Sequence, residues 1–167
     1  MRGAPIGAPV ILGVAGPHNS GKTTLLEVLI PAVIAAGFTV ATVKHIAHGD
    51  LDIDKGGSDT HRHKRAGATV AAAVSDTEAV YFHGKAHTLE EVLSRLEQLG
   101  PFDLVLVEGY KGSSIPKIVV GGAQHAGRAA YTWNGEQADA VRIASGLIGQ
   151  LRKRASKAQQ KEGKQGR

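Results

Sequence analysis

The chain has 167 residues, 42% of them hydrophobic, with no cysteine and a formal net charge of +5 at pH 7. This length suits one domain whose core is large enough to fold without cross-links. The lack of cysteine excludes disulfides and thiolate metal sites, and no stretch approaches the roughly 18 to 20 apolar residues that span a bilayer. We therefore expect a soluble protein with no membrane association, and the composition is compatible with the reducing cytoplasm.

The positive charge is concentrated at the C-terminal end. Residues 151–167 contain seven of the 20 basic residues and one of the 15 acidic ones, a net charge of +6. Residues 1–150 then hold 13 basic and 14 acidic residues, a net charge of −1. We expect residues 1–150 to form a nucleotide-binding domain and 151–167 a basic, disordered tail. A solvated tail is favoured over a nucleic-acid or membrane patch, because no aromatic side chain interrupts it to stack on bases.

Apolar periodicity predicts strands and helices that alternate along the chain. Strands are expected at residues 10–15, 38–44, 69–74, 79–82, 104–107 and 115–120. Helices are expected at residues 22–36, 58–66, 88–99 and 136–150. Such alternation with apolar strands predicts an α/β fold with a mainly parallel sheet and helices on both faces.

Gly16 to Thr23 fit the pattern G-x-x-x-x-G-K-[ST] between a predicted buried strand and a predicted helix, which is the context of a phosphate-binding loop. The glycines let successive backbone N–H groups point at phosphate oxygens, and the following helix directs its positive end at the same anion. Lys22 is expected to reach the β- and γ-phosphates, and the hydroxyl of Thr23 to bind Mg²⁺. The expected phosphate-binding residues are Gly16, Pro17, His18, Asn19, Ser20, Gly21, Lys22, Thr23 and Thr24.

Two further polar segments are expected at the same edge of the sheet, where ligands of parallel α/β folds bind. Glu108 ends the most apolar strand and is the candidate acidic partner of Mg²⁺, while Gly109 allows a backbone N–H to approach the γ-phosphate. Asp52 and Asp54 follow the second strand and are candidates for binding the metal through water or for orienting a hydrolytic water. Asp103 lies at the opposite end of its strand, roughly 16 Å away.

Several histidines lie near the aspartates, yet their spacings match no recognised zinc ligand pair. His45, His48, His61 and His63 are therefore interpreted as surface or phosphate-facing residues. Arg62 belongs to a short basic helix that is either an anion patch or a solvated face.

Taken in order, these segments resemble the molybdopterin-guanine dinucleotide biosynthesis protein B (MobB) family over about residues 9–120. The segments that carry the resemblance are residues 16–26, 43–45, 52–55, 57–63, 66–68, 104–111 and 116–118. The phosphate loop alone is shared by many families. Three further segments in fixed order are much more specific than the phosphate loop. They are Asp52-Ile53-Asp54-Lys55, then Asp59, Thr60 and Arg62, then Val107-Glu108-Gly109-Tyr110-Lys111.

The resemblance implies a P-loop NTPase-like, homodimeric GTP-binding protein with weak GTP hydrolysis. It further implies an adaptor for the nucleotidyltransferase MobA, which joins GMP to molybdopterin. By position, Gly16 to Thr24 would bind phosphates, Thr23 and Glu108 the metal, and Asp52, Asp54, Asp59 and Arg62 would lie near the nucleotide. Lys22, Asp54 and Glu108 are the residues expected to serve the hydrolysis.

Two alternatives remain open from the sequence. A small-molecule kinase shares the phosphate loop, but it normally needs an arginine-bearing lid, and the arginines of the second half before the tail are not clustered. A metallochaperone-type GTPase would use the histidine-rich segment to hold a metal ion. No Asn-Lys-x-Asp segment is present, so the sequence names no residue that recognises guanine.

Overall fold

The computed structural model describes residues 7–46, 56–84, 87–122 and 127–165. They form two compact units. Unit 1 contains Met1–His45 and Leu93–Arg167, and unit 2 contains Ile46–Val92.

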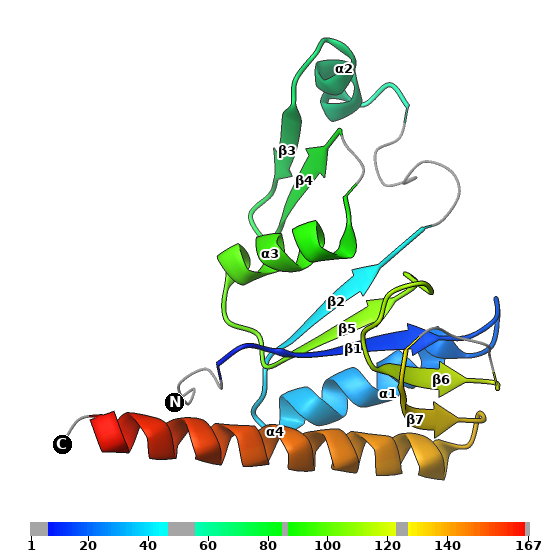
Figure 1. Cartoon of the computed structure of the whole chain (residues 1–167). Coiled ribbons are helices and arrows are strands. Elements are labelled where there is room, and N and C mark those ends of the chain that lie inside the picture. The colour runs from blue at the N-terminus through cyan, green and yellow to red at the C-terminus, as the bar shows by residue number, and fades with distance from the viewer. Residues whose placement is uncertain (1–6, 47–55, 85–86, 123–126, 166–167) are drawn as a thin grey trace. The chain divides into compact units, whose positions relative to one another are not determined.

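Unit 1 is built on a five-stranded parallel sheet with the order β2-β5-β1-β6-β7 (Figure 1). Its strands are β1 (Val10–Ala15), β2 (Val40–Lys44), β5 (Leu104–Glu108), β6 (Lys117–Val120) and β7 (Ala129–Trp133). The register places Val14 of β1 and Lys44 of β2 on either side of Glu108. The ends of β1, β2 and β5 therefore lie together, as the sequence predicts.

The core of unit 1 lies between the sheet and two helices, α1 (Lys22–Ala35) and α4 (Gln137–Gln165), which also pack on each other. Alternate strand residues face these helices, since side chains of a strand point to opposite faces in turn. The buried residues are Val10, Leu12, Val14, Leu104, Leu106, Ile118, Val120 and Trp133 from the sheet, with Leu25, Leu29, Val33, Ala140, Ile143, Ala144, Leu147 and Leu151 from the helices.

The other face of the sheet is also largely buried. Val105, Val107 and Val119 point to that side, and Leu93 and Leu96 of α3 (Leu89–Leu99) line a cavity with Ile11 and Val105. Helices thus lie on both faces of a mainly parallel sheet, which confirms the expected fold class.

Unit 2 contains α2 (Asp59–Arg65) and the antiparallel hairpin of β3 (Val70–Val74) and β4 (Ala79–His83). The Ser58 hydroxyl caps α2 by accepting from the N–H of His61 at 3.1 Å. The ammonium of Lys64 lies 4.8 Å from the centre of the Phe82 ring, which joins α2 to the hairpin.

Three features differ from the sequence prediction. The hairpin forms its own antiparallel sheet rather than joining the parallel one, and β7 was not predicted. The last helix continues to Gln165 instead of ending near Gln150, so the expectation of disorder directly after residue 150 is wrong. Lysine, arginine, alanine and glutamine are good helix formers, and low apolar content alone does not prevent a helix that extends from a packed one. Whether residues 1–150 bind nucleotide as one domain stays a prediction.

Candidate functional site

The loop from Gly16 to Gly21 joins the buried strand β1 to α1. Two of its residues have left-handed backbone conformations, Asn19 with φ +57° and Gly21 with φ +88°. A Cβ at Gly16 would lie 2.5 Å from the Ser20 hydroxyl oxygen and 3.1 Å from the carbonyl oxygen of Val120. The chain therefore turns back on itself in a space that admits only glycine at this position.

Trp133, at the end of β7, packs against the loop at Gly21. Its ring would lie 2.9 Å from a Cβ at Gly21, and its indole N–H donates to the carbonyl oxygen of Glu136 at 2.8 Å. The N–H of Gly121, just after β6, donates to the carbonyl of Trp133 at 3.1 Å. Sequence reasoning missed Trp133, because nothing in its neighbourhood marks a contact with a loop 112 positions earlier.

The first turn of α1 is suited to an anion. Its N-cap is Gly21, which offers no side-chain oxygen to the first N–H groups, and no acidic residue lies in that turn. By contrast, Ser58 caps α2, and the Thr88 hydroxyl caps α3 by accepting from the N–H of Glu91 at 3.2 Å. No side chain caps the first N–H groups of α1, so these groups and the positive helix end suit a bound phosphate.

Side chains of the loop provide further donors. The Lys22 ammonium donates to the carbonyl oxygen of Pro17 within the loop itself. The hydroxyl oxygen of Ser20 is buried and has no hydrogen-bond partner among the described residues. Thr23 is exposed at the start of α1. A buried hydroxyl without a partner is costly, and a phosphate oxygen would satisfy it.

A second part of the site lies at the end of β5. Glu108 is half-buried, and its carbonyl oxygen accepts from the N–H of His45 at 2.8 Å. Gly109 has φ +94°, and a Cβ there would lie 2.7 Å from the Cβ of His45. Tyr110 also has a positive φ, and its ring packs at a tilt of 32° against His45, with 4.4 Å between the ring centres. The chain thus turns sharply after Glu108 and leaves its carboxylate at the strand end.

The loop after Tyr110 is tied down by a buried lysine. Lys117 is 0% exposed, and its ammonium donates to the carbonyl oxygens of Ser113 and of Ile115, the latter at 3.2 Å. Its aliphatic stem occupies the space beside Gly13, where a Cβ would lie 2.9 Å from the lysine Cγ. Burial lowers the pKa of Lys117 from its usual 10.5, because the charged form loses its hydration.

Unit 2 holds two other predicted residues. Asp59 and Arg62 form an ion pair at 3.4 Å on α2, with both side chains largely exposed. Such a pair contributes little to stability. Asp52 and Asp54, and with them His48, lie outside the described residues. Asp103 lies at the opposite sheet edge, as expected, where its carboxylate accepts from the N–H and hydroxyl of Thr39.

The structure therefore brings together the predicted phosphate loop, Glu108 and Gly109 at one edge of the sheet in unit 1. Within the described part of the chain, no three histidine, aspartate or glutamate side chains form a group suited to a metal ion. None of the described helices combines the length and apolarity that a membrane crossing requires.

The site combines two features. A glycine-bounded loop joins a buried parallel strand to a helix without a side-chain cap, and the neighbouring strand ends in a carboxylate. Together they define an α/β protein of the P-loop NTPase-like class. The sequence profile of the family described as molybdopterin guanine dinucleotide synthesis protein B (MobB) matches residues 11–145. The chain belongs to this family.

Individual relatives agree with this assignment. The chain is similar to the molybdopterin-guanine dinucleotide biosynthesis adapter protein of Haemophilus influenzae, with 39% identity over 111 residues, which are 66% of this chain and 62% of the relative. The Escherichia coli adapter protein is 36% identical over 114 residues, 66% of this chain and 64% of the relative. The matches thus span less than two thirds of these relatives.

A solved structure supports the fold. The crystal structure of Bacillus subtilis MobB superimposes with a TM-score of 0.65 at 23% identity, and the match covers 84% of this chain and 96% of that one.

Proposed function

We propose that this protein binds GTP with Mg²⁺ at the loop Gly16 to Thr24 and acts in the cytoplasm as an adaptor in molybdenum cofactor biosynthesis. In this role it assists a MobA-type nucleotidyltransferase that attaches GMP to molybdopterin. The observation that carries the proposal is the phosphate loop with its uncapped helix start, in a chain that belongs to the MobB family.

The described residues suggest how a triphosphate would be held. Backbone N–H groups of the loop and of the α1 start would donate to the phosphate oxygens. The Ser20 hydroxyl, which has no partner among the described residues, would gain one. Lys22 would exchange the Pro17 carbonyl for a phosphate oxygen, a stronger acceptor because it is charged. Bound Mg²⁺ supplies neutralisation of phosphate charge, and Thr23 and Glu108 are the residues that would hold it.

Hydrolysis of GTP is proposed to be slow and secondary to the adaptor role. Lys22 and Glu108 would stabilise charge at the phosphates, and Asp54 is the candidate for orienting water. Asp52, Asp59 and Arg62 are proposed to lie near the nucleotide when it binds.

We also propose that the protein is a homodimer. One face of the hairpin in unit 2 carries Val70, Val74 and Tyr81, which are 46%, 75% and 66% exposed. These residues share a face because Tyr81 pairs with Ala72, which lies between the two valines. An exposed apolar sheet face of this kind is typical of a surface that a second chain covers.

The adaptor role is tested by reconstitution. A MobA-type enzyme, molybdopterin, GTP and Mg²⁺ are combined with and without this protein, and the guanine dinucleotide formed is measured by chromatography. We expect the protein to increase the yield, and the Lys22→Ala variant to give no increase. An unchanged yield at every ratio of the two proteins would contradict the adaptor role.

A further inference from the structure

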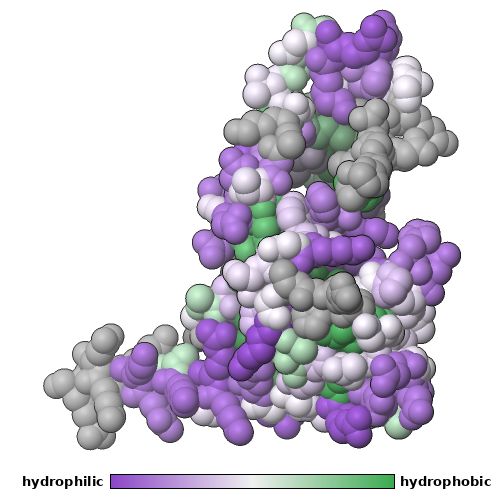
Figure 2. All heavy atoms as spheres, turned by 45° about the vertical axis from the view of Figure 1, so that its right-hand side comes forward, coloured by the Kyte–Doolittle hydropathy of each residue, from purple (hydrophilic) through white to green (hydrophobic). Residues whose placement is uncertain are grey.

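The C-terminal part of α4 is a feature that the family assignment does not account for. The family match ends at residue 145, whereas α4 continues to Gln165. The residues after 150 account for the net positive charge of the chain, since residues 151–167 have a net charge of +6 and residues 1–150 a net charge of −1. Hydrophilic side chains cover this part of α4 in Figure 2.

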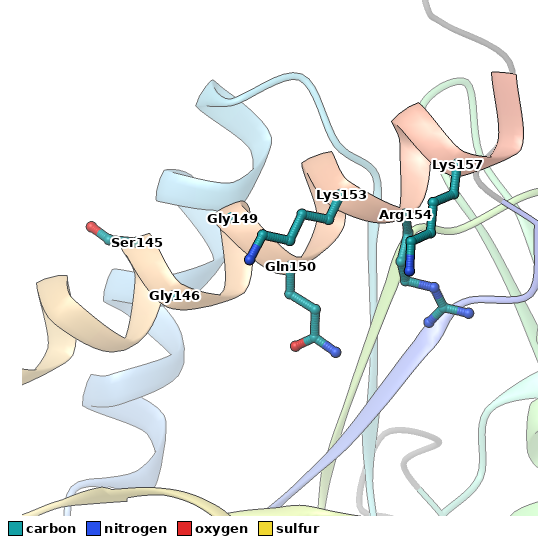
Figure 3. A pocket seen from close by; sticks show the side chains of 7 residues that line it. All are labelled: Ser145, Gly146, Gly149, Gln150, Lys153, Arg154 and Lys157. Carbon is teal, nitrogen blue, oxygen red and sulfur yellow. The ribbon is translucent and has the colours of Figure 1, made fainter. Parts of the chain in front are cut away.

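A groove of about 510 Å³ lies along one side of this helix. Its lining begins at the last residue of the family match and runs for more than three turns. The lining residues are Ser145, Gly146, Gly149, Gln150, Lys153, Arg154 and Lys157. Gln150, Arg154 and Lys157 extend to the same side of α4, and Lys153 folds back along the helix toward Gly149 (Figure 3).

Three cations of the groove lie within five consecutive positions of α4. They are spaced at i, i+1 and i+4, and no carboxylate among the described residues forms an ion pair with Lys153, Arg154 or Lys157. Like charges one turn apart on a helix repel each other, so an anionic group in the groove would relieve that repulsion.

The two glycines of the groove have different explanations. A Cβ at Gly146 would lie 3.2 Å from the Tyr131 hydroxyl oxygen, so this glycine lets β7 pack on the helix. A Cβ at Gly149 would meet nothing within 4 Å. Glycine is a poor helix former, and internal packing gives no reason for it at position 149. It leaves the floor of the groove open to a chain from outside.

We propose that this groove docks an acidic amphipathic helix of a partner protein. Gly149 leaves space beside the helix backbone that suits apolar side chains of a partner. Lys153, Arg154 and Lys157 offer cations to its carboxylates. Nucleic acid fits less well, because no aromatic residue is present from position 134 onward to stack on bases. The site is separate from the phosphate loop and does not depend on the proposed GTP binding.

The test uses the full chain and a synthetic amphipathic peptide of about 18 residues, with leucine and alanine on one face and glutamate on the other. Binding is measured by fluorescence anisotropy, with a matched peptide that has glutamine for glutamate and with a DNA duplex of about 20 base pairs. We expect the glutamate peptide to bind, to weaken as salt is raised, and to bind more tightly than the other two probes.

Three variants assign the interaction to the groove. Replacing Lys153, Arg154 and Lys157 by glutamine should weaken peptide binding about tenfold, since each exposed ion pair contributes modestly. Replacing the exposed Arg65, Arg95 and Lys111 by glutamine removes the same charge elsewhere and should have little effect. Gly149→Leu fills the floor without changing charge and should also weaken binding. Circular dichroism checks that α4 is retained.

The proposal is overturned if the glutamate peptide does not bind, or if the two triple variants bind it equally. A second result would also overturn the proposal: the protein binds the duplex more tightly than the peptide. If the triple variant of Lys153, Arg154 and Lys157 lost this duplex binding and Gly149→Leu kept it, the groove would be a nucleic-acid surface.

Discussion

Lys117 is the residue whose role is most unexpected for its type. Lysine is almost never fully buried, and here the ammonium donates to backbone carbonyls of the segment that follows Glu108 and Gly109. The N–H of Ser113 in turn donates to the carbonyl of Tyr110 at 2.9 Å. Lys117 thus holds in place the chain that leaves the candidate metal-binding end of β5.

This burial predicts a pH dependence of stability. The pKa of Lys117 is lower in the folded protein than the usual 10.5 of the unfolded chain. Between these two pKa values the unfolded chain therefore binds more protons at Lys117 than the folded protein does. The contribution of Lys117 to the free energy of unfolding rises with pH across that range. Each unit by which the pKa is lowered corresponds to about 1.4 kcal/mol. The free energy of unfolding is measured by urea unfolding at about pH 8 and about pH 10. Between these pH values it should rise more, or fall less, for the wild type than for Lys117→Met. Identical pH dependence in both proteins would contradict the account.

The sequence names candidate site residues where a local pattern demands them, and their roles stay predictions. Gly16, Gly21 and Lys22 have fixed places in a short motif, and Glu108 follows a strand that is apolar throughout. Trp133 and Lys117 act through contacts made only after folding, with Gly21 and with a loop carbonyl respectively. No spacing in the sequence indicates such contacts.

At the scale of elements, strand ends and helix starts explain the site. β1 and β5 are adjacent and parallel, so the phosphate loop and Glu108 lie at the same edge. The prediction succeeded for these strands because their apolar runs are long and bounded by turn residues. It failed for β7, whose sequence Ala129–Trp133 has only one fully buried residue, and for the end of α4, where polar composition was interpreted as disorder.

The hairpin of unit 2 carries the prediction about assembly. The double variant Val74→Glu and Tyr81→Glu places charge on its exposed apolar face and should raise the dimer dissociation constant at least about tenfold. Sedimentation equilibrium measures this change. The matched control, Leu99→Glu with Val141→Glu, alters exposed apolar residues elsewhere and should leave the dimer intact. A monomeric wild type, or a double variant that still dimerises as the wild type does, would contradict the proposed dimer surface.

At the scale of the whole molecule, three parts carry different proposed tasks. The parallel sheet of unit 1 presents the phosphate loop, the hairpin of unit 2 offers an apolar face, and the C-terminal part of α4 bears the charge. The division into two units was not predicted, because strand and helix alternation continues through residues 46–92 without a change in composition. The family resemblance of residues 9–120 is confirmed by the match to residues 11–145.

The proposed phosphate site is tested by calorimetric titration of GTP with Mg²⁺ into the wild type and the Lys22→Ala variant. We predict binding to the wild type and a loss of roughly 10- to 100-fold in the variant, the effect of removing one charged hydrogen-bond donor. Lys157→Ala removes the same charge far along α4 and should bind GTP as the wild type does. Equal GTP affinity in Lys22→Ala, with its fold intact, would contradict the assignment of the phosphate site.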